Sequence, residues 1–387
     1  MIKMLTACTT EIDEPQAAAQ EILKQLEQAG GLRKSSVGLL TCHADFITSG
    51  AIIKVCESLP FDVVGTTTLG AATNRDTGLE ILTLSVLTSD EVTFAAVLTD
   101  SLQEKQEEPI MAACESARST LPGQPSMVLA YAPLLPHVGG ERLLRLLDKA
   151  LKGVPVFGTL ACDHNFDFHD SQVVFNGKAH RDRLALVLMS GPVKYSFLTI
   201  SVPEGKAEKE SAIITESEGN VVKKVNDLPV LSYLETIGLT RESGLEGSKS
   251  IPVILNYNDG TPAVARCFYM ISPEGYAVCG GEMPMGATFG LSSMEPEDIL
   301  ISAGQVLNKV QENKNITAML IFPCIVRSVT LGVDQLAEAR LVSEKLGTSL
   351  PYQLCYSGGE ICPVYQKDGN TANRFHNFSF AACLFEE

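Results

Sequence analysis

The sequence predicts a mixed α/β (α+β mixed) protein of two domains. It is expected to consist of repeated helix–strand–helix–strand–strand–strand units whose mixed sheets are covered by helices. Amphipathic stretches alternate with short apolar runs along most of the chain. The same order of segments recurs, which indicates an internal repeat. The chain has 387 residues. That length exceeds the roughly 250–300 residues at which a single hydrophobic core stops growing, so two domains are expected.

The first unit opens with an amphipathic helix over residues 14–30, which ends at a pair of glycines. A continuous apolar run over residues 37–42 is typical of a strand covered on both faces. A second helix, a buried strand that ends in a Gly-Thr turn and two alternating strands are expected to follow, over residues 47–59, 62–68, 79–87 and 92–98.

The second unit repeats this order and indicates a duplication. Its helices and strands are expected over residues 109–121, 127–133, 140–151, 154–160, 172–176, 184–190 and 195–202. The turn Gly65-Thr66 of the first copy aligns with Gly158-Thr159 of the second. A third copy of the unit, with a weaker sequence signal, is expected over residues 296–311, 319–324, 334–346, 351–357 and 375–385.

A charged segment without apolar periodicity, residues 203–211, is the best candidate for a linker. We therefore expect one domain over residues 1–205, which contains the duplication, and a second α/β domain over residues 206–387. Long strands of the second domain are expected over residues 263–271, 275–280 and 287–292.

The charge balance excludes one class of partner. The chain has 30 Lys and Arg residues against 46 Asp and Glu residues, for a net charge of −16. A phosphate backbone or an anionic membrane surface would repel such a chain, so neither nucleic-acid binding nor membrane insertion is expected. No apolar run is long enough for a spanning helix, and the first residues do not resemble a signal peptide. The expected location is the cytoplasm, where the 11 Cys residues stay free thiols.

The two Gly-Thr turns are candidate ligand contacts, because ligands of open α/β sheets bind at the carboxyl ends of strands. Glycine leaves amide N–H groups free there, and threonine hydroxyls can hydrogen-bond a carboxylate or an amine. The alternative is a strand end that needs a positive φ, with threonine favoured by its strand propensity. The turns lack the G-x-G-x-x-G and P-loop patterns, so no nucleotide cofactor is expected. The candidate residues are Gly65, Thr66, Thr67, Gly158, Thr159 and Asp163.

A second group of candidates lies near the C-terminus, at the ends of three expected strands: Cys324, Arg327, Tyr356, Glu360, His376 and Asn377. Three interpretations are open. Arg327 could anchor a ligand carboxylate in a bidentate manner. Arg327 and Glu360 could instead form a buried ion pair. Cys324 could also be a nucleophile with His376 as its base.

The stretch over residues 162–170 contains two histidines and three aspartates. Its residue types fit zinc or iron, but neighbours along one loop rarely all face one ion, so a polar loop is expected rather than a metal site. Met283 and Met285 are interpreted as core fillers. No metal and no cofactor are expected.

The C-terminal pattern resembles the FIST domain of bacterial signalling proteins and of one class of eukaryotic F-box proteins. The resemblance covers most of the chain from about residue 35 onward. Here the arginine is single, and the Tyr-to-Glu turn has one extra residue. The matching residues in the C-terminal half are Cys324, Arg327, Leu331-Gly332, Tyr356, Gly359-Glu360, His376-Asn377, Gly280, Pro284 and Gly286. Those in the N-terminal half are Val64-Gly65-Thr66, Gly70, Phe157-Gly158, Asp163, Val174-Phe175-Asn176-Gly177 and Ser190-Gly191.

The resemblance implies a sensory module for a small ligand, such as an amino acid or a similar small carboxylate, in bacterial signal transduction. The leading hypothesis is a cytoplasmic sensor with a ligand in a cleft at strand ends or between the domains. It would act through a downstream signalling protein and would not be an enzyme. Two alternatives remain open: a cysteine-dependent enzyme that uses Cys324 or Cys162, and an interaction module without a ligand that recruits proteins through an apolar patch.

Overall fold

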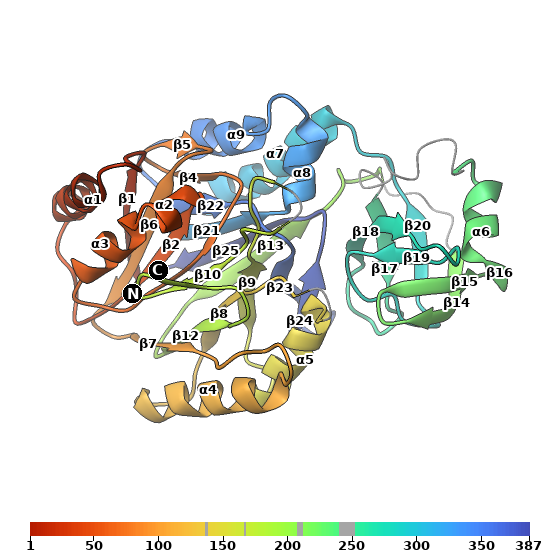
Figure 1. Ribbon diagram of the computed structural model, residues 1–387, viewed down its shortest axis with the longest axis horizontal. Coiled ribbons are helices and arrows are strands. Elements are labelled where there is room, and N and C mark those ends of the chain that lie inside the picture. Colours follow the sequence, from red (N-terminus) through yellow and green to blue (C-terminus); the bar gives the residue numbers. More distant parts are fainter. Residues whose placement is uncertain (136–137, 166–167, 207–211, 240–251) are drawn as a thin grey trace.

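The computed structural model describes residues 1–135, 138–165, 168–206, 212–239 and 252–387. Figure 1 shows two parts, a large one and a small one at the right. We call the described residues of 1–206 and 292–387 the body, and those of 212–291 the lobe. Helices cover mixed sheets, which confirms the predicted mixed α/β class. No helix in the described part of the chain is both long and apolar enough to cross a membrane.

The body contains three sheets of six strands each, and each sheet is centred on one repeat unit. The first sheet has the order β1-β6-β2-β3-β10-β11. Its own unit begins with a strand, β1, before the first expected helix. The elements of this unit are β1 (Lys3–Thr9), α1 (Pro15–Ala29), β2 (Ser35–Cys42), α2 (Asp45–Thr48), α3 (Ala51–Glu57), β3 (Val63–Thr67), β4 (Ala71–Thr73), β5 (Thr77–Gly78) and β6 (Leu82–Ser89).

The second unit has the same order of elements, and its sheet runs β24-β23-β9-β8-β12-β7. Strand β7 pairs with β12, so the stretch expected to end the first unit in fact begins the second. The elements are β7 (Thr93–Leu98), α4 (Glu107–Thr120), β8 (Met127–Ala132), α5 (Gly140–Leu151), β9 (Val156–Leu160), β10 (Val173–Phe175), β11 (Lys178–His180) and β12 (Ala185–Ser190).

The third copy, which has a weak signal in the sequence, is a full third unit in the structure, and its sheet has the order β13-β25-β21-β22-β4-β5. The lobe is inserted in this unit, between its first strand and its first helix. The elements are β13 (Tyr195–Ile200), α7 (Pro296–Glu312), β21 (Ile316–Pro323), α8 (Ile325–Leu331), α9 (Ala337–Leu346), β22 (Tyr352–Cys355), β23 (Glu360–Tyr365), β24 (Thr371–His376) and β25 (Phe380–Glu386).

The three units exchange short hairpins in a cycle. The hairpin β4-β5 of the first unit pairs with β22 of the third, and β10-β11 of the second pairs with β3 of the first. The hairpin β23-β24 of the third unit pairs with β9 of the second. Each unit therefore completes the sheet of another unit.

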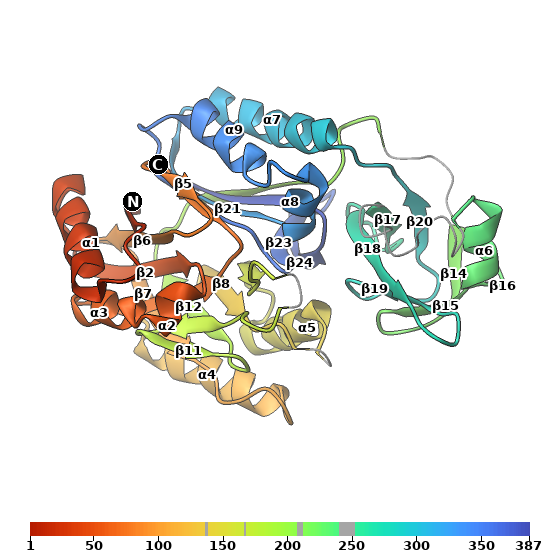
Figure 2. The same ribbon diagram turned by 45° about the horizontal axis from the view of Figure 1, so that its top comes forward.

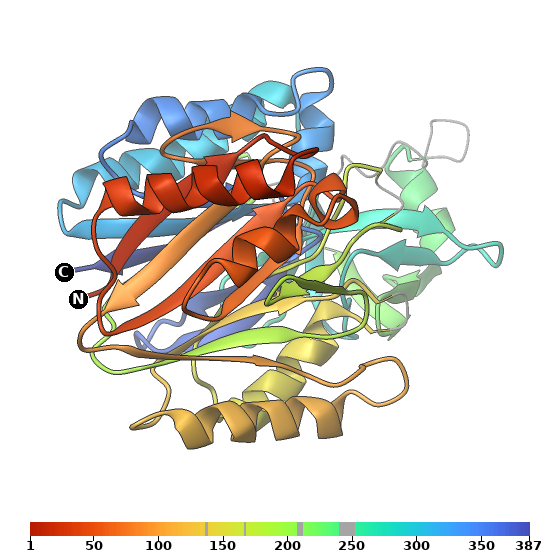
Figure 3. The ribbon, with the colours of Figure 1, turned by 60° about the vertical axis from the view of Figure 1, so that its left-hand side comes forward.

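Helices cover the outer faces of the three sheets, and the inner faces share one core. Figures 1 and 3 show α1 and α3, α4 and α5, and α7 and α9 on three outer sides of the body. Buried side chains from all three units meet inside. The rings of Phe157 and Phe322 stack there at a centroid distance of 4.9 Å, with Tyr131 edge-on to Phe322 at 6.2 Å. The interior between the sheets is thus packed with apolar side chains.

The lobe is a mostly antiparallel structure with its own core. Its sheet has seven strands in the order β14-β20-β17-β18-β19-β15-β16. Figure 2 shows it beside the body, joined at the third unit. Its elements are β14 (Ala212–Glu218), β15 (Val221–Val225), β16 (Leu228–Pro229), α6 (Val230–Thr236), β17 (Pro252–Asn256), β18 (Val264–Ile271), β19 (Ala277–Cys279) and β20 (Thr288–Leu291).

The expected domain boundary between residues 205 and 206 stays a prediction. In space, the chain leaves the body near this point and enters the lobe. It then returns at residue 292, and β25 pairs with β13 while β22 pairs with β4. Residues 206–387 therefore contribute to both the lobe and the body. The last five residues of the expected linker lie outside the described residues.

Candidate functional site: the seam between body and lobe

The two expected Gly-Thr turns are strand residues instead: Gly65, Thr66 and Thr67 lie in β3, and Gly158 and Thr159 lie in β9. The Cys162 amide donates to the Thr67 carbonyl at 3.4 Å, which joins the segment after β9 to the end of β3. Both Gly65 and Gly158 lack the positive φ considered as the alternative explanation. A Cβ at Gly65 would lie 2.0 Å from the Leu40 carbonyl oxygen, and one at Gly158 would lie 2.2 Å from that of Ala130. Close packing against the parallel neighbour explains both glycines.

The threonine hydroxyls of these two strands already have partners within the protein. The Thr66 hydroxyl donates to the Thr67 carbonyl, and the Thr67 hydroxyl accepts from the Gln172 amide at 2.8 Å. The Thr159 hydroxyl donates to the Ser357 hydroxyl at 2.7 Å. All three threonines are fully buried. These threonines connect the strand ends of different units, and their role as ligand contacts stays a prediction.

Asp163 organises the loop that follows β9. Its carboxylate accepts from the amides of Asn165 and Asp170, at 2.9 and 2.7 Å. The His164 ring lies 4.4 Å from that of His43, centroid to centroid. Among the described residues, no group of three or more His, Cys, Asp or Glu side chains could hold a metal ion. Residues 166 and 167 of the expected polar loop lie outside the described residues.

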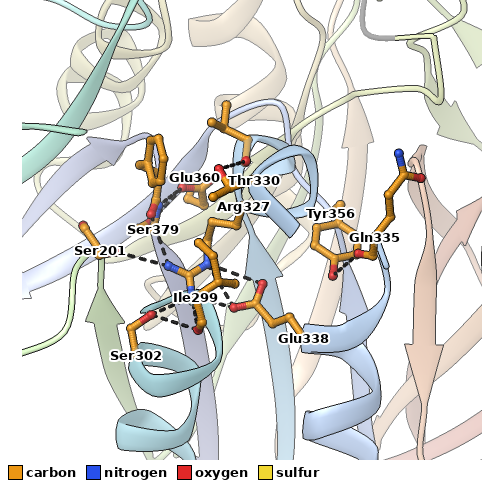
Figure 4. A network of polar contacts seen from close by, with 12 residues as sticks. Ser201, Ile299, Ser302, Arg327, Thr330, Gln335, Glu338, Tyr356, Glu360 and Ser379 are labelled. Atoms are coloured by element: carbon orange, nitrogen blue, oxygen red, sulfur yellow. Dashed lines mark hydrogen bonds and ion pairs between the residues drawn. The ribbon is translucent and has the colours of Figure 1, made fainter. Parts of the chain in front are cut away.

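Arg327 is a structural residue inside the body, as Figure 4 shows. Its side chain is fully buried and pairs with Glu338 of α9, Nη2 to Oε1 at 2.5 Å. Nη1 donates to the carbonyls of Ser201 and Phe378, and Nη2 also donates to the Ser302 hydroxyl. Since all three guanidinium nitrogens donate within the protein, the expected bidentate contact with a ligand carboxylate has no free donor. The alternative of an ion pair with Glu360 is also wrong, because the carboxylate partner is Glu338.

Glu360 lies on the other side of this network, fully buried at the start of β23 (Figure 4). Its Oε2 accepts from the amide and the hydroxyl of Ser379, at 3.2 and 2.6 Å. Its Oε1 is buried and has no N–H or O–H donor, although the weak S–H donor of Cys324 lies close to the carboxyl. Burial raises the pKa of this carboxyl to about 8, although hydrogen bonds from Ser379 and Cys324 oppose the shift. Tyr356 points away from Glu360 and donates to the Gln335 carbonyl at 3.1 Å.

The thiols do not form a nucleophile–base pair. Burial raises the pKa of Cys324 well above its usual value, and it raises that of Cys162 to about 12. His376, the candidate base, bonds the Cys362 carbonyl through Nε2 at 2.9 Å, and burial lowers its pKa to about 4. Both thiols therefore stay protonated at neutral pH. This geometry does not support the cysteine-dependent enzyme.

Asn377 is the candidate residue that contacts the lobe. We define the seam as the contact between the body and three parts of the lobe: β17, β18 and the Gly280-Gly281 turn. The backbone N–H of Asn377 donates to the backbone carbonyl of Ala265 in the lobe at 3.2 Å. A Cβ at Gly280 would lie 3.2 Å from the Asn377 Oδ1, and one at Gly359 would lie 3.5 Å from its Nδ2. The Asn377 side chain therefore lies between two glycines, and its Oδ1 is buried without a partner.

An ion pair that the sequence interpretation missed lies in the same seam. Arg266 of the lobe is fully buried, and its Nη2 lies 2.8 Å from Oε1 of Glu141 in α5. Arg266 also donates to the Phe375 carbonyl and the Tyr257 hydroxyl, at 2.9 and 2.6 Å. The other oxygen of Glu141, Oε2, is buried without a partner. The one signal in the sequence was a lone charge in the apolar run of residues 263–271.

Asn377 and Glu141 thus each bring a buried oxygen without a donor to the seam. Glu360 of β23, which pairs with His376, the neighbour of Asn377, has a third buried oxygen without an N–H or O–H donor. The Arg374 Nε is a buried donor without an acceptor, and the same side chain bonds Asp259 of the lobe. Buried polar groups of this kind are costly unless a partner satisfies them.

Glu360 should make stability depend on pH. Its folded pKa of about 8 is above the ordinary value of 4.5, so the folded state retains a proton that the unfolded state loses. The free energy of unfolding should therefore fall as the pH rises from about 4.5 to about 8. Glu360→Gln should flatten this part of the profile in urea unfolding. The exposed Glu344→Gln is the control and should follow the wild type; equal slopes in all three proteins would contradict the assignment.

The fold and the seam together define a multi-unit α/β protein with an inserted lobe and a buried polar junction between the two. Models of protein families match most of the chain: the FIST N domain over residues 36–228 and the FIST C domain over residues 230–363. The chain belongs to the FIST family, whose domains are sensory domains of signal transduction. No curated protein matches the sequence. The boundary between the two matches falls within the lobe, at β16.

Proposed function

We propose that this protein is a cytoplasmic sensor that binds a small polar ligand in the seam and signals through a downstream protein. The observation that carries the proposal is the set of buried oxygens without N–H or O–H donors on Glu360, Asn377 and Glu141. An ammonium group would supply the missing hydrogen bonds, and a carboxylate could accept from the Arg374 Nε. An amino acid or a similar small carboxylate with an amine presents both groups.

The protonation of Glu360 suits it to such a ligand. With the proton on, the carboxyl can donate to a ligand oxygen through Oε1; with the proton off, Oε1 can accept from an ammonium. Because the pKa of about 8 is close to neutral, either state is accessible at small cost. The site lies between body and lobe, so a bound ligand would contact both and favour one arrangement of the two.

A thermal-shift and calorimetric screen of amino acids and other small amines tests the proposal. A true ligand at a hundredfold excess over its Kd should raise the free energy of unfolding by about 2.7 kcal/mol. Asn377→Ala and Glu360→Gln should weaken its binding at least about tenfold, which corresponds to about 1.4 kcal/mol for one lost hydrogen bond.

The matched control is Ser85→Ala, because the Ser85 hydroxyl is another buried polar atom without a partner, but it lies in β6 within the body. It should bind the ligand as the wild type does. If no compound in the screen stabilises the protein, or if Asn377→Ala and Glu360→Gln bind a hit unchanged, the seam is not the ligand site.

A further inference from the structure

The lobe has the features of a part that can separate from the body without unfolding. Its hydrophobic core consists entirely of its own residues, from Ala212 to Phe289, with no side chain from the body. The chain crosses between the two parts twice, after β13 and before α7. A part with its own core and two crossings can keep its structure when its contact with the body opens.

The apolar part of the contact is small. One cluster of six buried side chains joins lobe and body: Ala265, Cys267, Met294, Ile299, Leu331 and Phe378. Polar pairs surround it. Arg145 of α5 binds Glu282 in a bidentate manner at 2.5 and 2.7 Å, and Arg374 of β24 binds Asp259 at 2.5 Å. Interfaces of this polar type usually permit relative motion of the parts they join.

The Glu141–Arg266 pair is the buried element of this contact, and it is incomplete. Glu141 Oε1 pairs with Arg266 Nη2 at 2.8 Å and also accepts from the backbone amide of Glu282 at 2.8 Å. The other oxygen, Oε2, has no partner. In the docked state Arg266 needs Glu141, because an unpaired buried charge is strongly unfavourable. When the lobe is undocked, water can solvate both groups. The pair therefore couples the charge of Glu141 to the position of the lobe.

We infer that the lobe undocks from the body as a folded unit, and that the Glu141–Arg266 pair is the latch that sets the balance between docked and undocked states. Undocking would open the seam and give a ligand access to Glu360 and Asn377. In this respect the inference rests on the proposed function, whereas the latch itself can be measured without any ligand.

Hydrogen exchange and small-angle scattering of the full chain test the latch. Glu141→Gln removes the charge and keeps the shape. Gly281→Ala leaves the charges in place but puts a Cβ 2.5 Å from the Glu141 Oε1 and 2.7 Å from the Arg266 Nε. Both variants should speed the exchange of the Glu282 and Asn377 amides at least about tenfold. The radius of gyration should also increase, while amides between β17 and β18 stay as protected as in the wild type.

Asp148→Asn is the matched control. It makes the same kind of change on the same helix, but the Asp148 carboxylate binds Asn373 within the body, at 2.6 Å. Its seam amides should exchange as in the wild type. Unchanged seam amides in both latch variants would overturn the inference. Equal acceleration of the amides inside the lobe would overturn it too, since the lobe would then unfold rather than undock. A failed ligand screen with a working latch would refute only the proposed ligand site.

Discussion

Glu338→Ala should lower the free energy of unfolding by about 3–5 kcal/mol, because it leaves the Arg327 guanidinium buried without its countercharge. Both side chains of the pair are fully buried. The other acceptors of Arg327 are neutral: the carbonyls of Ser201, Phe378 and Ile299 and the hydroxyl of Ser302. They can satisfy its N–H groups but cannot balance its charge. Urea unfolding followed by circular dichroism measures the loss.

The control for this variant is Asp334→Ala, which breaks the Arg340–Asp334 ion pair in the same region of the third unit. Both of its side chains are about half exposed, so the loss should be within about 0–1 kcal/mol. Equal losses in the two variants would show that Arg327 does not lock α8 to α7 and α9. A loss in Glu338→Ala of less than about 1 kcal/mol would contradict the assigned role as well.

Gly158→Ala should destabilise the body by about 1–3 kcal/mol or more, because a side chain at this position has no space. The added Cβ would lie 2.2 Å from the backbone oxygen of Ala130 in the parallel neighbour β8. Backbone cannot move aside as a flexible side chain can, so β8 and β9 must separate. The same separation would disturb the Thr159–Ser357 hydrogen bond at the end of β9. Gly65→Ala should behave alike, since its Cβ would lie 2.0 Å from the Leu40 oxygen.

Gly304→Ala is the control for the glycine variants. Gly304 lies within α7, and a Cβ there has no atom within 4 Å. Alanine should therefore stabilise the helix by about 0.5–1 kcal/mol. Thermal unfolding of the three variants gives the comparison. If Gly158→Ala were as stable as the wild type, close backbone packing would not be the reason for glycine at this position.

Sequence periodicity was sufficient to predict the repeat units, because their helices and central strands are long enough to show a period. The exchange of hairpins was not predictable, since strands such as Ala71–Thr73 and Val173–Phe175 are too short to indicate a partner. The third unit was hard to recognise for a similar reason. Leu354 occupies the position that Gly65 and Gly158 hold in the other units, so the Gly-Thr signature is absent there.

The candidate site was predictable in part. The sequence placed Glu360 and Asn377 in one cluster. The structure brings Asn377 to the junction of body and lobe, whereas Glu360 pairs with His376 and bonds Ser379 within the body. The role of Arg327 was not predictable, because its partner Glu338 lies on a helix that carries several other acidic and basic residues. Arg266 and Glu141 are 125 residues apart in sequence. A pair of single charges so far apart gives no pattern that would join them.

The cyclic exchange of hairpins has a consequence for synthesis on the ribosome. The sheet of the first unit needs β10 and β11, the sheet of the second needs β23 and β24, and the third needs β25, which ends at Glu386. The sheets of the first and second units are therefore incomplete when their own segments leave the exit tunnel, and the sheets of the second and third units are completed only by the last stretch of the chain. A nascent chain would thus expose open strand edges until translation ends, so chaperones that shield such edges should matter more for this protein than for one whose units close independently.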